Sequence, residues 1–200
     1  MIIFIRHGED MTDLYNEVGG WTDRGLSPLG IKQSFELVDK IKNLSRKYGE
    51  IELIMTSPFA RAKMMADIFG QELGIRVEEN LYLKERNTYG LASGMSKDVL
   101  KNDFPNLYEM YESGGVMPGS ERYIDFVLRL DSLLKKLFNL SGNILCVSHG
   151  HLMTVLLKEY FNQSYLKVTG GGGMVIDKTD KGWKLIEKWG MKANVYDKWV

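Results

Sequence analysis

Three short segments of the chain are built almost entirely of apolar residues and lack the polar–apolar alternation of a half-exposed strand. They are residues 2–5, 51–55 and 143–147. A strand with apolar side chains on both faces is typical of a parallel sheet that is covered by helices. Because a helical pattern follows each segment, the sequence predicts an α/β fold with a mostly parallel sheet.

The first predicted helix has clear start and stop signals. Ser27 is a favoured N-cap residue, Pro28 suits the first helical position, and Gly49 is expected to end the helix. Apolar residues recur between them at intervals of three and four, which predicts one buried face. The expected members of this face are Ile31, Phe35, Val38, Ile41 and Leu44.

The same start signal, Ser57 followed by Pro58, comes after the second apolar segment. It predicts a helix that runs to about residues 70–74 and carries Arg61 in its first turn. A helix N-terminus offers free N–H groups to an anion, and an arginine adds a bidentate donor.

Near the end of the sequence, the four glycines 170–173 predict a flexible turn. The turn would lead into two strands at residues 174–177 and 183–189, which we expect to pair at least partly antiparallel.

Residues 91–118 interrupt the alternation of strands and helices. They are rich in Ser, Gly, Met and Tyr, with two short helical stretches at best. We therefore expect one domain, residues 1–200, with a cap insertion at about residues 86–122 over the ligand-binding edge. Its aromatic and Met residues either line a pocket or form the insertion's own core, and burial preferences favour a core. These residues are Tyr89, Met95, Tyr108, Met110 and Tyr111.

Cationic and imidazole side chains occur where the apolar segments end. Arg6 and His7 follow the first segment, Arg61 follows the second, and His149 follows the third. Ligands of open α/β sheets bind at the carboxyl ends of the strands. Two arginines and two histidines suit a phosphoryl group, whose charge is spread over three oxygens. The alternative for Arg6 and His7 is an ordinary surface pair in a turn.

An imidazole can attack phosphorus and hold the phosphoryl group covalently, and an acid must then protonate the leaving oxygen. Glu85, which lies between two basic residues after an apolar pair, is the candidate for this acid. The alternative is a solvated loop of mixed charge.

The ordered set of motifs resembles the histidine phosphatase superfamily, also called the phosphoglycerate mutase-like family. The matching segments are Arg6-His7-Gly8-Glu9, Leu26-Ser27 with Gly30 and Gln33, Ser57-Pro58-Phe59-Ala60-Arg61-Ala62, Leu83 to Glu85, and Val147-Ser148-His149-Gly150. The resemblance implies a three-layer α/β/α sandwich around a mostly parallel sheet, with an inserted cap. It also implies activity without a metal or another cofactor.

The resemblance further implies roles for individual residues. His7 would be the nucleophile that forms a phosphohistidine. Arg6, Arg61 and His149 would bind the phosphoryl oxygens, and Glu85 would act as general acid and then as general base for water.

Two further substrate-binding residues are implied by the resemblance, Asn16 and Gly150. The loop between Glu9 and Asn16 is about three residues longer than is usual in the family. This difference leaves the correspondence of Asn16 open.

Two activities share this machinery. Residues 20–23 and 94–97 resemble the sequences of phosphoglycerate mutases, which depend on 2,3-bisphosphoglycerate. Such mutases carry an arginine pair in the insertion, whereas residues 98–121 contain only Lys101 as a basic residue. We therefore expect a phosphatase that acts on a small phosphorylated metabolite, with the mutase as the alternative. A protein that binds phosphorylated ligands without turning them over is a third reading.

Composition limits the partners. The chain has 26 basic and 26 acidic residues, which argues against nucleic acid or an anionic membrane as the main partner. The single cysteine, Cys146, lies in an apolar segment and is expected to be buried. No signal peptide is recognised, so a cytoplasmic protein is expected. The sequence does not determine the oligomeric state, and a homo-oligomer is one of the options.

A metal site built from the three histidines is a less favoured alternative. His151 lies two residues beyond His149, after a glycine, and we expect its side chain to point elsewhere.

Overall fold

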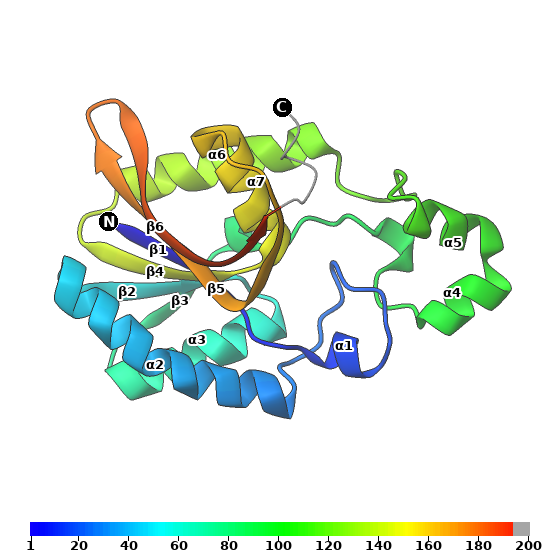
Figure 1. The fold of residues 1–200 in the computed structure, drawn as a ribbon, viewed down its shortest axis with the longest axis horizontal. Coiled ribbons are helices and arrows are strands. Elements are labelled where there is room, and N and C mark those ends of the chain that lie inside the picture. Colours follow the sequence, from blue (N-terminus) through cyan, green and yellow to red (C-terminus); the bar gives the residue numbers. More distant parts are fainter. Residues whose placement is uncertain (194–200) are drawn as a thin grey trace.

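A computed structural model describes residues 1–193, so the last seven residues of the predicted domain lie outside the described part. Its centre is a six-stranded sheet in the order β3-β2-β4-β1-β5-β6 (Figure 1). The strands are β1 (Ile2–Arg6), β2 (Ile51–Thr56), β3 (Val77–Glu79), β4 (Asn143–Ser148), β5 (Tyr165–Thr179) and β6 (Gly182–Ala193). The first four strands in this order are parallel, and β5 and β6 are antiparallel additions.

Helices cover both faces of the sheet, which confirms the predicted three-layer α/β/α sandwich (Figure 1). The helices are α1 (Met11–Leu14), α2 (Pro28–Tyr48), α3 (Ala60–Leu73), α4 (Lys97–Asp103), α5 (Pro105–Glu112), α6 (Tyr123–Phe138) and α7 (Gly150–Phe161). Within residues 1–193, no helix combines the length and the apolar character that crossing a bilayer requires.

The continuous apolar sequence of β1 follows from its position between the two helical layers. Ile3 and Ile5 belong to the core under α2 and α3, whereas Ile2 and Phe4 belong to the core under α6 and α7. All four side chains are fully buried. A strand in this position has no solvent-facing side, which is why polar alternation is absent.

Helix α2 confirms the predicted caps but not the whole predicted face. Ser27 accepts a hydrogen bond from the N–H of Gly30, and Gly49 is the C-cap. The prediction for Phe35 was wrong, because this side chain is 50% exposed. Gly30 and Ser34 occupy the buried positions instead. A Cβ atom on Gly30 would lie 2.0 Å from the carbonyl oxygen of Glu9, so only small residues fit where α2 crosses this loop.

Helix α3 begins at Ala60, two residues later than Ser57 and Pro58 predicted. The N–H of Ser57 still donates to the carbonyl of Val147 at 3.0 Å, which continues the pairing of β2 with β4. The chain therefore turns into the helix only after this bond. Ser57 is not used as a helix cap, and its hydroxyl bonds to a histidine described below.

The predicted flexible turn at residues 170–173 was wrong, because these glycines lie inside β5. A Cβ atom on Gly173 would lie 2.2 Å from the Trp189 ring and 2.6 Å from the carbonyl oxygen of Phe4. Glycine is needed there because the indole packs directly on the strand. The predicted antiparallel pairing of the last two strands is confirmed.

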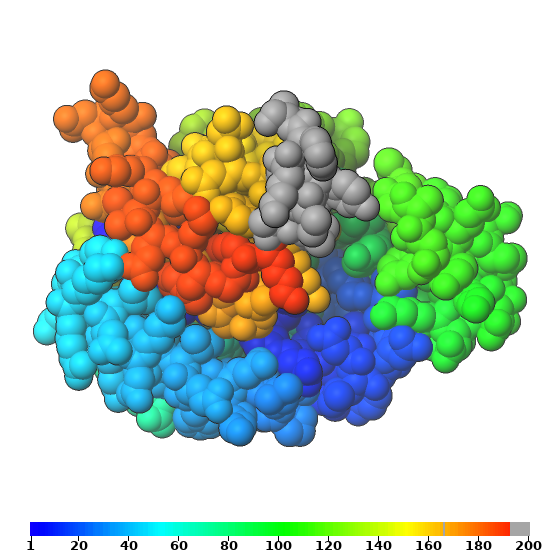
Figure 2. All heavy atoms as spheres, in the orientation of Figure 1, coloured from blue at the N-terminus to red at the C-terminus, as the bar shows by residue number. Residues whose placement is uncertain are grey.

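Residues 86–122, which we call the extension, contain α4 and α5 and form a lobe at one end of the molecule (Figure 2). Val18, Ala92, Leu100 and Met117 make a small buried core there. The five aromatic and Met residues expected to form such a core are all partly buried against it. The division into one domain with a cap stays a prediction.

Candidate active site

The register of the parallel strands brings their carboxyl ends to one edge of the sheet. Arg6 of β1 lies opposite Ser148 of β4, and Thr56 of β2 lies opposite Val147 of β4. The residues that directly follow these three strands therefore meet at this edge.

His7 follows β1 and is 4% exposed. Its Nδ1 atom lies 2.7 Å from the carbonyl oxygen of Gly8, and Arg61 Nε donates to its Nε2 atom at 3.1 Å. A carbonyl oxygen only accepts, so this network assigns the ring proton to Nδ1. The lone pair of His7 is thereby left on Nε2.

The surroundings of His7 keep its imidazole neutral. Burial lowers its pKa well below the usual value of about 6.5, and the positive charges of Arg61 and Arg6 lower it further. The hydrogen bond to Gly8 acts in the opposite direction, but it is the smallest of the four effects. A neutral imidazole is the form that can act as a nucleophile.

The guanidinium of Arg61 is held by the loop that precedes α2. Its Nη1 donates to the carbonyl of Thr22 at 2.5 Å, and its Nη2 donates to the carbonyl of Gly20 at 2.8 Å. Asp10 Oδ2 lies 3.4 Å from Nε. Burial lowers the pKa of Arg61, and Asp10 opposes that effect. Each Nη atom keeps a second N–H, so two donors remain for an anion.

Arg6 lies on the other side of His7. Its Nη1 donates to the carbonyl of Val168 at 2.6 Å. Its buried Nε has no hydrogen-bond partner within residues 1–193. A Cβ atom on Gly150 would contact this side chain at 3.4 Å, so the glycine leaves room beside the guanidinium.

His149 lies directly behind His7, with the ring centroids 5.1 Å apart. It is fully buried, its Nε2 lies 2.8 Å from Ser57 Oγ, and its Nδ1 has no partner in the described part of the chain. Burial and neighbouring Arg61, in that order, lower its pKa well below the usual value. Its predicted contact with phosphoryl oxygens stays a prediction.

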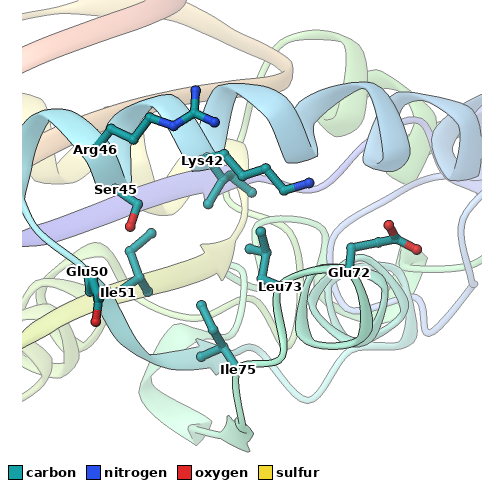
Figure 3. A pocket seen from close by; sticks show the side chains of 9 residues that line it. Lys42, Ser45, Arg46, Glu50, Ile51, Glu72, Leu73 and Ile75 are labelled. Carbon is teal, nitrogen blue, oxygen red and sulfur yellow. The ribbon is translucent and has the colours of Figure 1, made fainter.

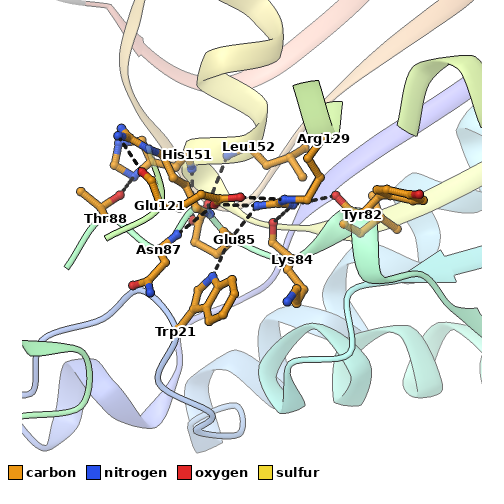
Figure 4. Close-up of polar contacts among 12 residues, drawn as sticks. Trp21, Tyr82, Lys84, Glu85, Asn87, Thr88, Glu121, Arg129, His151 and Leu152 are labelled. Carbon is orange, nitrogen blue, oxygen red and sulfur yellow. Dashed lines mark hydrogen bonds and ion pairs between the residues drawn. The ribbon is translucent and has the colours of Figure 1, made fainter. Parts of the chain in front are cut away.

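The carboxylate of Glu85 caps helix α7. Oε2 accepts from the N–H of His151 at 3.2 Å, and Oε1 accepts from the N–H of Leu152 at 3.2 Å (Figure 4). Oε1 also accepts from the N–H of Arg86 at 2.9 Å. These contacts place the carboxylate beside the cavity that contains His7.

This cavity has a volume of about 340 Å³ and opens between the sheet edge and the extension. Arg6, His7, Arg61 and Glu85 all line it. Its other lining residues are Asp10, Thr12, Asp13, Glu17, Gly19, Gly20, Tyr89, Lys97, Tyr111 and Lys167. An adjoining cavity of about 260 Å³ shares Arg6, Glu85, Tyr89 and Lys167 with it and is also lined by Gly150.

The structure does not bring Asn16 into either cavity. Asn16 is exposed, has a φ of 52°, and accepts a hydrogen bond at its carbonyl from the N–H of Lys97. Sequence reasoning also missed Asp10, Ser57 and Lys167. For Asp10 the sequence does contain a signal, since it caps α1 through the N–H of Thr12.

A larger cavity than these two lies elsewhere. A groove of about 510 Å³ lies at the opposite end of the sheet, between α2, α3 and the start of β2 (Figure 3). It contains none of the predicted site residues. Lys42, Arg46, Glu50 and Glu72 give its rim both signs of charge, so its shape and chemistry do not select a ligand.

No group of three or more His, Cys, Asp or Glu side chains within residues 1–193 is arranged to hold a metal ion. The side chain of His151 is turned toward the Thr88 hydroxyl, with Nδ1 3.4 Å from Oγ1. The three histidines therefore do not converge on one point.

The sequence and the fold resemble those of known proteins. A family model described as the histidine phosphatase superfamily (branch 1) matches residues 2–176. A protein of Bacillus subtilis (strain 168) described as the uncharacterized phosphatase PhoE is 30% identical over 160 residues, which cover 79% of this chain and 76% of that protein.

The chain is also similar to mutases, over about half its length at 33% identity and over 91% of it at 26% identity. The 2,3-bisphosphoglycerate-dependent phosphoglycerate mutase of Rhodopseudomonas palustris (strain BisB18) is 33% identical over 101 residues, 49% of this chain and 47% of that mutase. The solved structure of the α-ribazole phosphatase from Shigella flexneri superposes with a TM-score of 0.75 at 20% identity, covering 97% and 98% of the two chains. At this identity the likeness supports the fold alone.

Proposed function

Because this chain belongs to the histidine phosphatase superfamily, we propose that it hydrolyses a small phosphorylated metabolite through a phosphohistidine on His7. One observation carries the proposal. The Nε2 lone pair of a neutral, buried His7 lies in a cavity that also contains Arg6, Arg61 and Glu85. A nucleophile, two fixed cations and an acid around one space are the parts that phosphoryl transfer needs.

In the first step, His7 Nε2 attacks phosphorus, and the bond from phosphorus to the ester oxygen breaks. The hydrogen bond from Arg61 Nε–H to His7 Nε2 breaks when the Nε2 lone pair bonds to phosphorus. Arg61 and Arg6 then donate to the phosphoryl oxygens as their charge grows. Glu85 gives its proton to the leaving oxygen, so that an alcohol departs.

In the second step, water attacks phosphorus on the phosphohistidine. Glu85, now a carboxylate, takes one proton from this water, and the bond between phosphorus and Nε2 breaks. Inorganic phosphate leaves, and His7 regains its lone pair. Each step returns Glu85 and His7 to the form that the next step needs.

The size of the site supports a small substrate. The cavity around His7 and its neighbour on the far side of Glu85 have volumes of about 340 and 260 Å³. The phosphoryl group would occupy the first, and the leaving group would extend past Glu85 into the second. Lys167 and Tyr89 line both cavities and would contact the leaving group.

The alternative is a 2,3-bisphosphoglycerate-dependent mutase. The likeness of the chain to such mutases favours it. However, Lys97 is the one basic residue of the extension among the described residues that line the site cavity. A bisphosphorylated intermediate carries several negative charges, and one lysine from the extension neutralises only a small part of them. The small number of basic residues therefore favours the phosphatase.

The test compares hydrolysis with isomerisation. We expect phosphate release from 4-nitrophenyl phosphate and from a panel of metabolite phosphomonoesters. Little isomerisation of 3-phosphoglycerate is expected, with or without 2,3-bisphosphoglycerate. Efficient bisphosphoglycerate-dependent isomerisation with negligible hydrolysis would establish the mutase instead.

The covalent step has its own test. His7→Ala and His7→Gln should lower kcat by at least about a thousandfold. Arg76→Met, which changes an exposed arginine directly before the edge strand β3, should retain full activity. Rapid quenching with a ³²P-labelled substrate should trap an acid-labile, alkali-stable phosphoenzyme in the unchanged protein only. Full activity in a folded His7→Ala variant would refute the mechanism.

A further inference from the structure

The main-chain carbonyl of Glu85 is held by two side chains that come from distant parts of the sequence. Trp21 Nε1 donates to it at 2.7 Å, and Arg129 Nη2 donates to it at 3.3 Å (Figure 4). Trp21 lies in the loop before α2, and Arg129 lies on α6. The side chain of Glu85 is held separately by the first turn of α7.

Arg129 uses all five of its N–H groups in this region. Nη1 donates to the carbonyls of Tyr82 at 2.9 Å and Lys84 at 2.8 Å. Nε and Nη2 donate to the two carboxylate oxygens of Glu121 at 3.0 and 2.9 Å. With the contact to Glu85, the planar fork is fully satisfied. A lysine has three donors on one atom and cannot reproduce this arrangement.

These contacts hold a segment that has little regular hydrogen bonding of its own. Leu81–Leu83 form a single turn of 3₁₀-helix, and the chain then runs as a loop to the extension. Arg129 and Glu121 are only 15% and 17% exposed, so water competes weakly for these bonds. The backbone that carries Glu85 is thus fixed by α6 instead of by its own secondary structure.

Trp21 links this backbone to the arginine beside His7. The carbonyl oxygens of the residues on either side of it, Gly20 and Thr22, accept hydrogen bonds from Arg61. One short loop therefore contacts both Arg61 and Glu85. A shift of this loop would change the distance between the groups proposed to bind the phosphoryl oxygens and to protonate the leaving oxygen.

We propose that Arg129 and Trp21 are positioning residues, which fix Glu85 at the distance from His7 that protonation of the leaving oxygen requires. This inference rests on the proposed function. Proton transfer depends on placement within a few tenths of an ångström, and the two bonds to the Glu85 carbonyl, with the cap on α7, leave the carboxyl little freedom.

The test uses the acidity of the leaving group. An alkoxide needs a proton to depart, whereas 4-nitrophenolate leaves without one. We therefore compare kcat and KM for glycerol 2-phosphate and for 4-nitrophenyl phosphate. Glu85→Gln serves as the reference for loss of the acid, and Arg76→Met is the matched control at an exposed arginine.

Arg129→Met and Arg129→Lys should lower kcat for glycerol 2-phosphate by about 30- to 100-fold, within the range that general acid catalysis supplies. Their kcat/KM for 4-nitrophenyl phosphate, which reports only the steps up to release of the leaving group, should fall by less than about threefold, because 4-nitrophenolate departs without the acid. Trp21→Phe keeps the ring and loses only the N–H, so the same selective loss of about three- to tenfold is expected. KM should change little, since the proposed phosphoryl contacts remain.

An equal loss on both substrates in the folded Arg129→Lys and Trp21→Phe variants, or no loss on either, would overturn the inference. Their folding is checked by circular dichroism and thermal unfolding. The proposed function fails in a different way. If Glu85→Gln itself shows no preference for the activated substrate, the assignment of the acid is wrong, whatever Arg129 does.

Discussion

Two buried imidazoles, His7 and His149, lie against each other beneath the candidate site. Arg61 lies beside both, and burial is the main cause of the low pKa of each. Each ring is therefore neutral in the folded protein at pH values where a histidine in an unfolded chain is already charged. This difference links the stability of the fold to pH.

The pH prediction follows from the sign of these shifts. Below about pH 6.5 the unfolded chain binds a proton at each histidine, whereas the folded protein does not. The free energy of unfolding should therefore fall as pH is lowered from 7.5 to 5.5. Each histidine contributes a slope of up to about 1.4 kcal/mol per pH unit. Urea unfolding at three pH values measures this slope, and His149→Gln should reduce it. A constant free energy of unfolding across this range would contradict the prediction.

Individual residues differ in how far their placement could be predicted. Arg6, His7 and His149 end continuous apolar strands, so the strand register alone brings them to one edge. Asn16 lies in an irregular loop with a left-handed backbone, and no periodicity fixes its direction. Arg129 was not identified because it acts on main-chain carbonyls more than 40 residues away, and these contacts leave no pattern in the sequence.

Helix α2 shows how one element positions the candidate site. It crosses the loop that carries Gly8 and Glu9 at a distance that only glycine permits. Gly30→Ala would improve helix propensity by about 1 kcal/mol. The added methyl group would lie 2.0 Å from a main-chain oxygen, and such overpacking costs about 1–3 kcal/mol. The steric cost outweighs the gain in helix propensity, so the net change in the free energy of unfolding is destabilising.

We therefore expect Gly30→Ala to lower the free energy of unfolding by about 1–2 kcal/mol and to reduce the proposed activity, because the methyl group presses on the backbone of Glu9, two residues after His7. Urea unfolding and activity on 4-nitrophenyl phosphate measure the two effects. Lys32→Ala, at an exposed position of the same helix, is the control and should change stability by less than about 0.5 kcal/mol. A stabilised Gly30→Ala protein would show that the loop moves freely away from the helix.

At the scale of elements, sequence patterns predicted which segments are helices and strands better than where they begin and which side is buried. Apolar residues do recur with helical spacing over residues 31–44, yet Phe35 faces solvent. Small residues, Gly30 and Ser34, take the buried positions where α2 crosses the loop closely. The glycines 170–173 resemble a turn, but they lie inside β5, where Gly173 leaves room for the Trp189 ring. Both errors arise from contacts between distant segments, which local patterns do not contain.

The whole molecule consists of a sandwich and an extension at one end of it (Figure 2). Val18, in the loop before α2, is fully buried in the small core of the extension. Its N–H donates to the carbonyl of Met95, and its carbonyl accepts from the N–H of Gly94, both at 2.8 Å. Val18 therefore joins the loop before α2 to the extension beside the cavity.

Val18→Ala should loosen the extension without unfolding the sheet. Removing two buried methyl groups costs about 1–3 kcal/mol, and most of that loss should appear locally. Hydrogen exchange followed by mass spectrometry should show faster exchange in residues 90–117 and unchanged protection in β1 and β4. Val116→Ala, at a side chain that is 84% exposed in the same lobe, is the control and should change neither. Equal loss of protection across the sheet would show that the two parts unfold together.

The position of β1 in the sheet has a consequence for biosynthesis. This strand comes first in the sequence, but its partners are β4 and β5, which begin at residues 143 and 165. During translation the apolar segment 2–5 therefore waits, unpaired, until the segments that form β4 and β5 have left the ribosome. The strand that leads to His7 is thus synthesised long before its partners, and a nascent chain that stops before residue 143 would present an unpaired apolar strand that is prone to aggregation.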